Sequence, residues 1–166
     1  LPPAYEDAWF CPAPNGHILA TGYDARGRKQ YRYHPDWQAA QANTKYGGLI
    51  AFCSALPTLR SRLDRDLRHA PGDRDFTLAA LVLLLDRSFL RIGNSEYAAQ
   101  NGSFGATTLL RRHVRIGKNG VRLDFTAKGG KRFRKALRDR KLHRVLQAVG
   151  DLPGRQLFTY VDAEGA

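Results

Sequence analysis

Arg91 is the first residue whose chemistry attracts attention. It follows the most apolar stretch of the chain, Leu78 to Leu85, and stands two residues before Gly93. A guanidinium offers two parallel donors that fit the oxygens of a phosphate, so an arginine at the end of a rigid helix could stabilise charge on a phosphodiester. An arginine also suits a helix C-terminus, by up to about 1 kcal/mol. The residues alone leave both interpretations open.

A second group of candidate residues lies together in one short segment, 28–34. It combines basic side chains with an amide and two tyrosines: Arg28, Lys29, Gln30, Tyr31, Arg32 and Tyr33. Glutamine can recognise a base edge, and tyrosine can pack against sugar or phosphate. The alternative is a strand whose alternate aromatic side chains belong to a core.

The charge of the chain points to a polyanionic partner. Lys and Arg number 27 and Asp and Glu 15, giving a net charge of +12. Residues 111–144 hold 14 basic and two acidic residues, so this segment carries the whole excess. Basic residues massed in one segment favour nucleic acid, whose condensed counterions are released on binding. A solvated face usually mixes both signs.

Other classes of function have little support in the sequence. The five histidines lack metal-ligand spacing, the two cysteines are too few for a disulfide framework or a Cys-rich metal site, and there is no P-loop. No apolar run is long enough to span a membrane, and no signal peptide is visible. We therefore expect no cofactor, no metal, no membrane association and a cytoplasmic location.

The N-terminal third predicts a hairpin followed by helices. Residues 1–16 are rich in Pro and Gly and indicate a loop, and residues 17–23 and 28–34 indicate two strands joined by a turn at Asp24–Gly27. A helix over 37–46 should end at Gly47–Gly48. A second helix should follow, kinked at Pro57, with an apolar stripe at three- and four-residue spacing. Its members are Leu49, Phe52, Leu56, Leu59, Leu63 and Leu67.

The remainder predicts a buried helix, a three-stranded sheet and a final helix. Thr77 could cap a helix over 78–91, and Gly93 should close it. Asn94 or Ser95 could cap a short helix that runs through Gln100. Alternating residues after 113 indicate strands around turns at 118–120 and 127–130, and Asp139 should cap a helix that ends at Gly150. The fold class is therefore α+β, with a boundary at His34–Pro35 between a β-rich piece and a mainly helical domain.

Three blocks of the sequence resemble the type IB DNA topoisomerases of the compact bacterial and poxvirus-like kind. Residues 24–34 (DARGRKQYRYH) look like the family's D-x-x-G-R-x-Q-Y-x-Y block. Residues 90–97 (LRIGNSEY) look like its R-[IF]-G-x-x-x-Y block, and residues 102–109 (GSFGATTL) resemble its G-x-x-x-L-T-T-L region. The order and spacings of the blocks are compatible with the family. The resemblance implies residues 1–34 as the end of a DNA-clamping domain and 35–166 as a partial catalytic domain.

The resemblance also implies roles for individual residues. Arg91 would stabilise negative charge on the phosphate, and Lys128, on the turn where the family places its lysine, would be the general acid for the leaving 5′ oxygen. Among the turn's basic residues, composition alone does not favour Lys128 over Lys131. Arg28, Lys29, Gln30, Tyr31 and Tyr33 would contact the major groove. Tyr97 would contact the backbone near the active site, and Lys131 would bind DNA.

The implied activity is transient cleavage of one strand of duplex DNA through a 3′-phosphotyrosyl intermediate, without ATP, by a nucleoid-associated monomer clamped on its substrate. The family's second arginine, histidine and nucleophilic tyrosine have no match here. Tyr160 lies in the context of an upstream segment, so we expect a fragment that is inactive alone. A tyrosine recombinase is one alternative, but recombinases lack the block around Gln30–Tyr31. The other is a non-catalytic nucleic-acid-binding module, which would leave Arg91 without a purpose.

Overall fold

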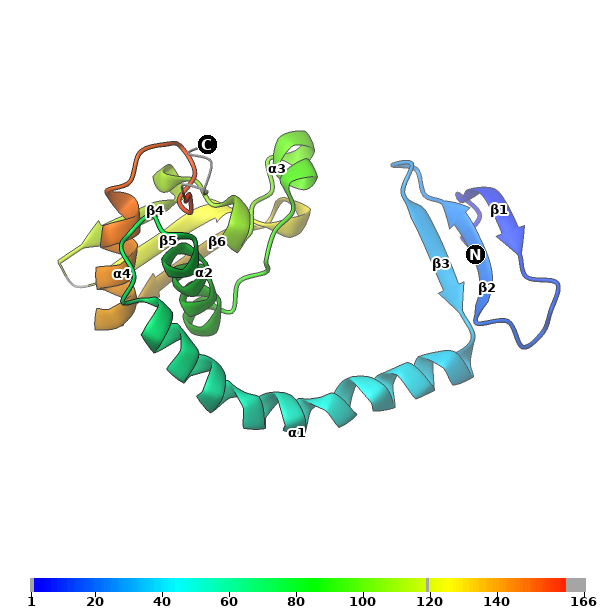
Figure 1. Cartoon of the computed structure of the whole chain (residues 1–166). Helices are drawn as coiled ribbons and strands as arrows, with labels where there is room; N and C mark the ends of the chain where they lie inside the picture. The colour runs from blue at the N-terminus through cyan, green and yellow to red at the C-terminus, as the bar shows by residue number, and fades with distance from the viewer. Residues whose placement is uncertain (1, 119, 161–166) are drawn as a thin grey trace. The chain divides into compact units, whose positions relative to one another are not determined.

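The computed structural model of the chain describes residues 2–118 and 120–160, without the side chains of residues 43, 45 and 46. Two three-stranded antiparallel sheets and a set of helices confirm the α+β fold class (Figure 1). The chain divides into two compact units, Leu1–Leu56 and Pro57–Ala166. The boundary predicted at His34–Pro35 stays a prediction about domains. No helix in the described part of the chain is long and apolar enough to cross a membrane.

The first unit contains a sheet in the order β1-β2-β3, with β1 at Glu6–Phe10, β2 at Ile18–Tyr23 and β3 at Lys29–Tyr33. The hairpin of β2 and β3 confirms the prediction, and Gly27 adopts the positive φ of 69° that the turn requires. The prediction of a loop over residues 1–16 was wrong, because this segment contains β1. Every residue of β1 is exposed, and its register shifts between Glu6 and Trp9, so no alternating pattern marked it.

One helix, α1, runs without interruption from Pro35 to Asp66. The predicted helix end at Gly47–Gly48 was therefore wrong. Each glycine costs a helix roughly 1 kcal/mol relative to alanine, which weakens a helix of this length without ending it. The prediction that Pro57 does not end the helix is confirmed.

The apolar stripe predicted along this helix is buried only near its C-terminal end. Leu63 is buried and Leu67, just past the helix, packs against the core, whereas Leu49, Phe52 and Leu59 are 52%, 60% and 39% exposed. The pattern correctly indicated a helix. It did not indicate that the apolar side chains of the earlier turns are largely exposed.

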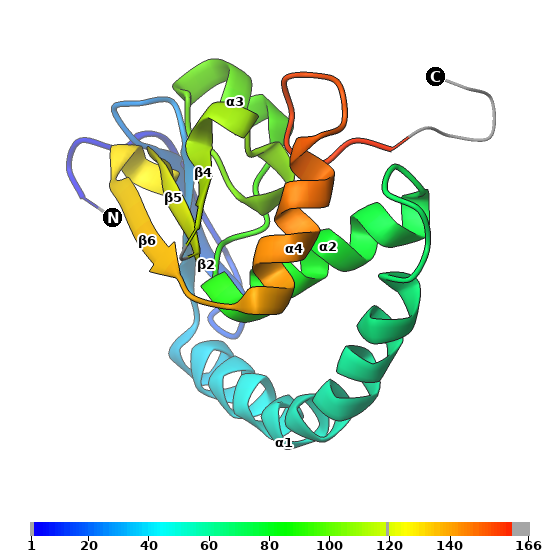
Figure 2. The ribbon, with the colours of Figure 1, turned by 90° about the vertical axis from the view of Figure 1, so that its left-hand side faces the viewer.

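The core of the second unit forms where two helices pack on one side of a sheet (Figure 2). The helices are α2 at Arg74–Ser88 and α4 at Arg140–Gly150, and the sheet order is β4-β5-β6. Its strands span Val114–Gly117, Gly120–Thr126 and Arg132–Leu137. Asp139 caps α4 by accepting a 2.8 Å hydrogen bond from the Leu142 amide, as predicted, and the predicted apolar face of α4 is buried.

Shorter elements connect these parts. Helix α3 at Ser95–Asn101 is capped by Asn94, which accepts bonds from two backbone amides. Three 3-10 turns follow: η1 at Ala106–Thr108, η2 at Arg111–His113 and η3 at Lys128–Gly130. The strand pair predicted around residue 119 is present, although Asn119 itself lies outside the described residues.

Candidate active site

Arg91 lies beyond the end of α2. The prediction placed it in the last turn of a helix over 78–91, with Thr77 as cap and Gly93 closing the helix. The structure corrects all three points. Asp73 is the N-cap, the helix ends at Ser88, and Phe89 adopts the left-handed conformation at φ 58°. Because a non-glycine residue takes this conformation, the glycine signal pointed four residues too far along the chain.

A backbone hydrogen bond and the side chain of Lys135 hold the end of α2 in place. The Phe89 amide donates to the Leu85 carbonyl at 2.9 Å, and Lys135 Nζ donates to the Ser88 carbonyl at 3.0 Å. The same ammonium lies 4.9 Å from the centroid of the Phe89 ring. A cation on the last carbonyls of a helix also opposes the negative end of its dipole. Lys135 therefore fixes the point from which the chain continues to Arg91.

The segment Arg91–Gly93 is bonded to the backbone that follows α3. The Arg91 carbonyl accepts from the Ala106 amide at 2.9 Å, and the Ile92 carbonyl accepts from the Thr107 amide at 2.8 Å and its hydroxyl at 3.0 Å. These bonds hold the backbone carbonyls of Arg91 and Ile92 in place.

Gly105 permits this pairing. A Cβ on Gly105 would lie 2.5 Å from the Gly93 Cα and 2.7 Å from the Arg91 carbonyl oxygen, and both contacts are with backbone. Gly93 has φ 104°, and its own Cβ would meet the Gly105 Cα at 3.0 Å. The two segments can approach this closely only because both positions lack a side chain.

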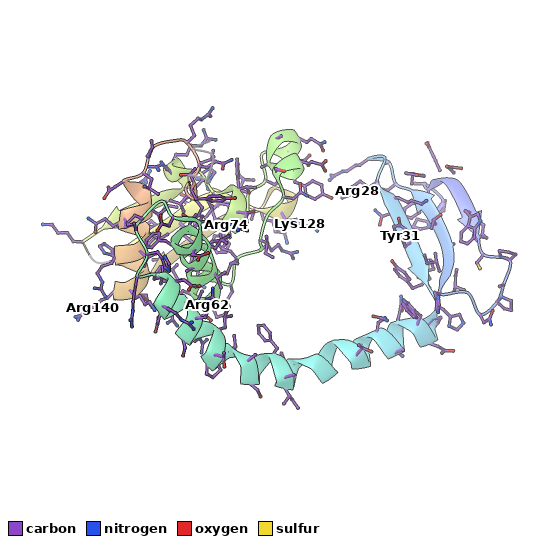
Figure 3. The ribbon with its side chains drawn as sticks, viewed as in Figure 1. Arg28, Tyr31, Arg62, Arg74, Lys128 and Arg140 are labelled. Carbon is purple, nitrogen blue, oxygen red and sulfur yellow. The ribbon has the colours of Figure 1, made fainter. Side chains whose placement is uncertain are left out.

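Lys128 stands on the turn between β5 and β6 (Figure 3). The turn is closed by the Ala127 amide, which donates to the Lys131 carbonyl at 2.7 Å, and Gly129 and Gly130 both have φ 75°. Just before it, the Thr126 carbonyl accepts from the Phe104 amide at 2.8 Å. Phe104 lies two residues before Ala106, whose amide bonds to the Arg91 carbonyl. A continuous backbone network therefore connects the segment that carries Arg91 with the turn that carries Lys128.

The side chains of this site are available to an anion. Arg91, Lys128 and Lys131 are exposed, and within the described part of the chain none of them makes a side-chain hydrogen bond or ion pair. Tyr97, on α3, is 57% exposed. A guanidinium and an ammonium that are exposed to solvent and carried by hydrogen-bonded backbone can contact a phosphodiester that lies across the surface.

In the first unit, the side chain of Asp24 organises two of the predicted DNA contacts. Its Oδ2 accepts from Arg28 Nε at 2.9 Å, Arg28 Nη2 at 2.7 Å and Gln30 Nε2 at 3.0 Å, while Oδ1 accepts from the Arg26 and Arg28 amides. The Arg28 side chain holds the pKa of the Asp24 carboxyl well below its usual range. A carboxylate only accepts hydrogen bonds, so the Gln30 amide must turn its NH₂ group toward Asp24.

Strand β3 carries its predicted contact residues on two faces. Tyr31 and Tyr33 share one face, are 49% and 38% exposed, and stack with ring centroids 6.1 Å apart. Gln30 belongs to the opposite face, because side chains alternate along a strand. Lys29 shares the tyrosine face and lies 5.9 Å from the Tyr23 ring. A shallow hollow of about 420 Å³ on this face is lined by Asp7, Trp9, Ile18, Thr21, Tyr23, Lys29 and Tyr31.

In the second unit, a hollow of about 530 Å³ is lined by residues that include Arg111, His143 and Asp151, but not Arg91, Lys128 or Lys131. Arg111 is engaged in holding the end of α4: its guanidinium donates to the carbonyls of Val149, Gly150, Pro153 and Gln156. Arg111 is thus engaged within the fold, whereas Arg91, Lys128 and Lys131 keep their side chains exposed. Among the described residues, no three potential metal ligands gather in one place.

Asp24, Gly105 and Lys135 have roles in the structure that the sequence alone did not predict. Asp24 stood in the matched block, and its position as first residue of a tight turn was a usable signal, because Asp there often bonds to the following amides. The contacts of Gly105 and Lys135 join residues that lie far apart in the sequence, so spacing alone could not indicate them.

Comparison with known proteins gives two family matches. The catalytic core of eukaryotic DNA topoisomerase I matches residues 34–165, and the N-terminal domain of bacterial DNA topoisomerase IB matches residues 1–24. The DNA topoisomerase 1B of Acanthamoeba polyphaga mimivirus is 31% identical over 99% of the chain and 49% of its own length. The DNA topoisomerase 1B of vaccinia virus (strain Copenhagen) is 22% identical over 75% of the chain and 39% of its own length. The chain thus spans half or less of these curated relatives.

Proposed function

This chain belongs to the type IB DNA topoisomerases, and from that premise we propose that it serves the transient cleavage and religation of one strand of duplex DNA. One observation carries the proposal. The Arg91 guanidinium and the Lys128 ammonium have no side-chain partner among the described residues. One network of backbone hydrogen bonds holds the two segments that carry them. Unpaired cations are common on protein surfaces, so the shared backbone network is what distinguishes this pair.

In the proposed reaction, a tyrosine oxygen forms a bond to the phosphorus of a phosphodiester and the bond to the 5′ oxygen breaks. Arg91 stabilises the additional negative charge on the non-bridging oxygens, and Lys128 donates a proton to the leaving 5′ oxygen. The product is a 3′-phosphotyrosyl linkage and a free 5′ hydroxyl. Religation reverses these steps, and because the linkage conserves the bond energy, no ATP is needed. We assign no residue of this chain to the nucleophile.

The remaining predicted contacts position the duplex. Gln30, with its NH₂ group held by Asp24, presents its carbonyl oxygen and its second N–H to a base edge, while Arg28, Lys29, Tyr31 and Tyr33 contact the backbone and groove. Tyr97 and Lys131 contact the backbone beside Arg91 and Lys128. We further propose that the enzyme acts as a monomer on duplex DNA and is associated with the nucleoid in the cytoplasm.

The proposed function is tested by a plasmid relaxation assay. The protein used contains this chain and has the full length of the relatives. It should relax supercoiled plasmid with neither ATP nor added metal. Arg91→Ala should slow relaxation by about 10²–10³-fold, the cost of removing one preorganised donor. A requirement for ATP, or full activity of Arg91→Ala, would overturn the proposal.

A further inference from the structure

The outer face of the β4-β5-β6 sheet is exceptionally basic. Helices α2 and α4 cover the other face, where Val121, Leu123 and Phe125 are buried. Side chains alternate along a strand, so the residues between these point outward. The outward positions include four exposed arginines and one carboxylate: Arg115, Arg122, Arg132, Arg134 and Asp124.

The single carboxylate is engaged with only part of this face. Asp124 pairs with Arg132 and, at 3.5 Å, with Arg134. Arg115 and Arg122 have no ion pair with any described residue. Four positive charges against one negative leave the face with a net charge of +3.

Arg115 and Arg122 also lie directly opposite each other in the β4–β5 pair. Like charges at directly opposed positions destabilise an antiparallel pair. Their neighbour across β6 is Ala136, which supplies no counter-charge. An arrangement that is unfavourable for folding alone is accounted for if an anion occupies the space between the two guanidinium groups.

The arginines continue the surface that begins at the Lys128 turn. Thr126 and Arg132 form the pair that flanks this turn, and Arg134 lies two residues further along β6. From Thr126, where β5 ends at this turn, to Arg122 is four residues of strand, or about 14 Å at roughly 3.4 Å per residue. A duplex advances about 3.4 Å per base pair, so Arg122 lies about four base pairs from the turn along the strand.

We propose that this face, defined by Arg115, Arg122, Arg132 and Arg134, binds the phosphate backbone of the DNA that flanks the cleavage site. The inference rests on the proposed function, because the Lys128 turn must first hold the same duplex. A second copy of the chain is a poor occupant, since two faces of charge +3 repel each other. Arginine also matches phosphate geometry with two donors, which lysine does not.

The test compares two double variants of the chain. Arg115→Gln with Arg122→Gln removes the unpaired arginines of the face. Arg68→Gln with Arg74→Gln is the matched control, because both of these arginines are exposed, lack described side-chain partners and lie outside the sheet. The affinity of each protein for a duplex of about 30 base pairs is measured by fluorescence anisotropy at several salt concentrations.

The face variant should give a log–log salt slope shallower by up to about 1.8, which is two phosphate contacts at roughly 0.9 each. The control should change the slope by less than half as much. Thermal melting at low salt should show the face variant to be at least as stable as the wild type, since the opposed like charges are gone. A loss of stability would mean that the arginines support the fold, and it would overturn the inference.

The remaining outcomes separate this inference from the proposed function. If the wild-type chain does not bind duplex DNA, the proposed function fails. If it binds with a steep slope that the face variant retains, only the inference fails. Joining of a labelled duplex to an immobilised one by the wild type but not by the face variant would assign the face to a second duplex and overturn the flanking assignment.

Discussion

Arg91 and Lys128 are both cations, so a loss of activity on substitution would not separate their roles. Their proposed chemistry differs, because Lys128 protonates the leaving 5′ oxygen whereas Arg91 stabilises charge on the phosphate. A substrate with sulfur in place of the bridging 5′ oxygen separates them, since a thiolate leaves without a proton. Lys128→Ala should be slow on the normal substrate and close to wild type on the sulfur-bridged one.

Arg91→Ala should remain slow on both substrates, because charge on the phosphate still has to be stabilised. Arg91→Lys should also be poor, since an ammonium cannot make the planar two-pronged contact. Single-turnover cleavage rates on the two substrates measure both effects. Equal rescue of both alanine variants, or of neither, would remove Lys128 as general acid and make Lys131 or another basic residue of that turn the candidate.

Asp24 should act on DNA through the residues that it orients. Asp24→Asn removes the charge that holds Arg28 and the acceptor that sets the direction of the Gln30 amide. If Asp24 acts through Gln30, the Asp24→Asn substitution should clearly reduce duplex affinity in the wild type. The same substitution should reduce it much less in a Gln30→Ala background. A double-mutant cycle of binding measures this coupling. Additive effects would mean that Asp24 does not act through Gln30.

At the scale of elements, the site depends on a contact between two glycines. Gly105→Ala would place a Cβ against the backbone of Gly93 and Arg91, so the two bonded segments must separate and Arg91 must move. Strand cleavage should slow by at least about tenfold, because small displacements of a positioning group are costly. The defect should persist on the sulfur-bridged substrate, since it acts through Arg91.

Gly48→Ala is the control for this variant. Gly48 lies inside α1, and a Cβ there would meet nothing within 4 Å. This substitution should preserve the cleavage rate and raise the free energy of unfolding by about 0.5–1 kcal/mol. Rescue of Gly105→Ala by the sulfur-bridged substrate would contradict its proposed action through Arg91.

Local signals in the sequence predicted most elements but not the positioning of Arg91. The hairpin around Gly27, the cap at Asp139 and the apolar face of α4 follow from short-range patterns, and all three are confirmed. The end of α2 depends on Lys135, which is 47 residues from Ser88, and on the left-handed conformation of Phe89. Such long-range contacts leave no periodic trace, so the predicted end at Gly93 was wrong.

At the scale of the whole molecule, the basic excess has more than one use. Arg111 holds the end of α4 and Lys135 holds the end of α2, so some of the charge in residues 111–144 supports the fold. The turn at Lys128 and the outer face of the sheet remain exposed and basic. Net charge alone predicts a polyanionic partner, whereas the structure separates the cations that support the fold from those that stay exposed.

The chemistry of the broken DNA ends tests the central claim most directly. Full-length enzyme is mixed with supercoiled plasmid without ATP, cleavage is trapped with detergent, and the DNA ends are analysed. The account predicts single-strand breaks with protein linked to the 3′ end and a free 5′ hydroxyl that a kinase can label, with the yield of breaks greatly reduced in Arg91→Ala. Protein linked to the 5′ end, or breaks that form equally well in Arg91→Ala, would contradict it.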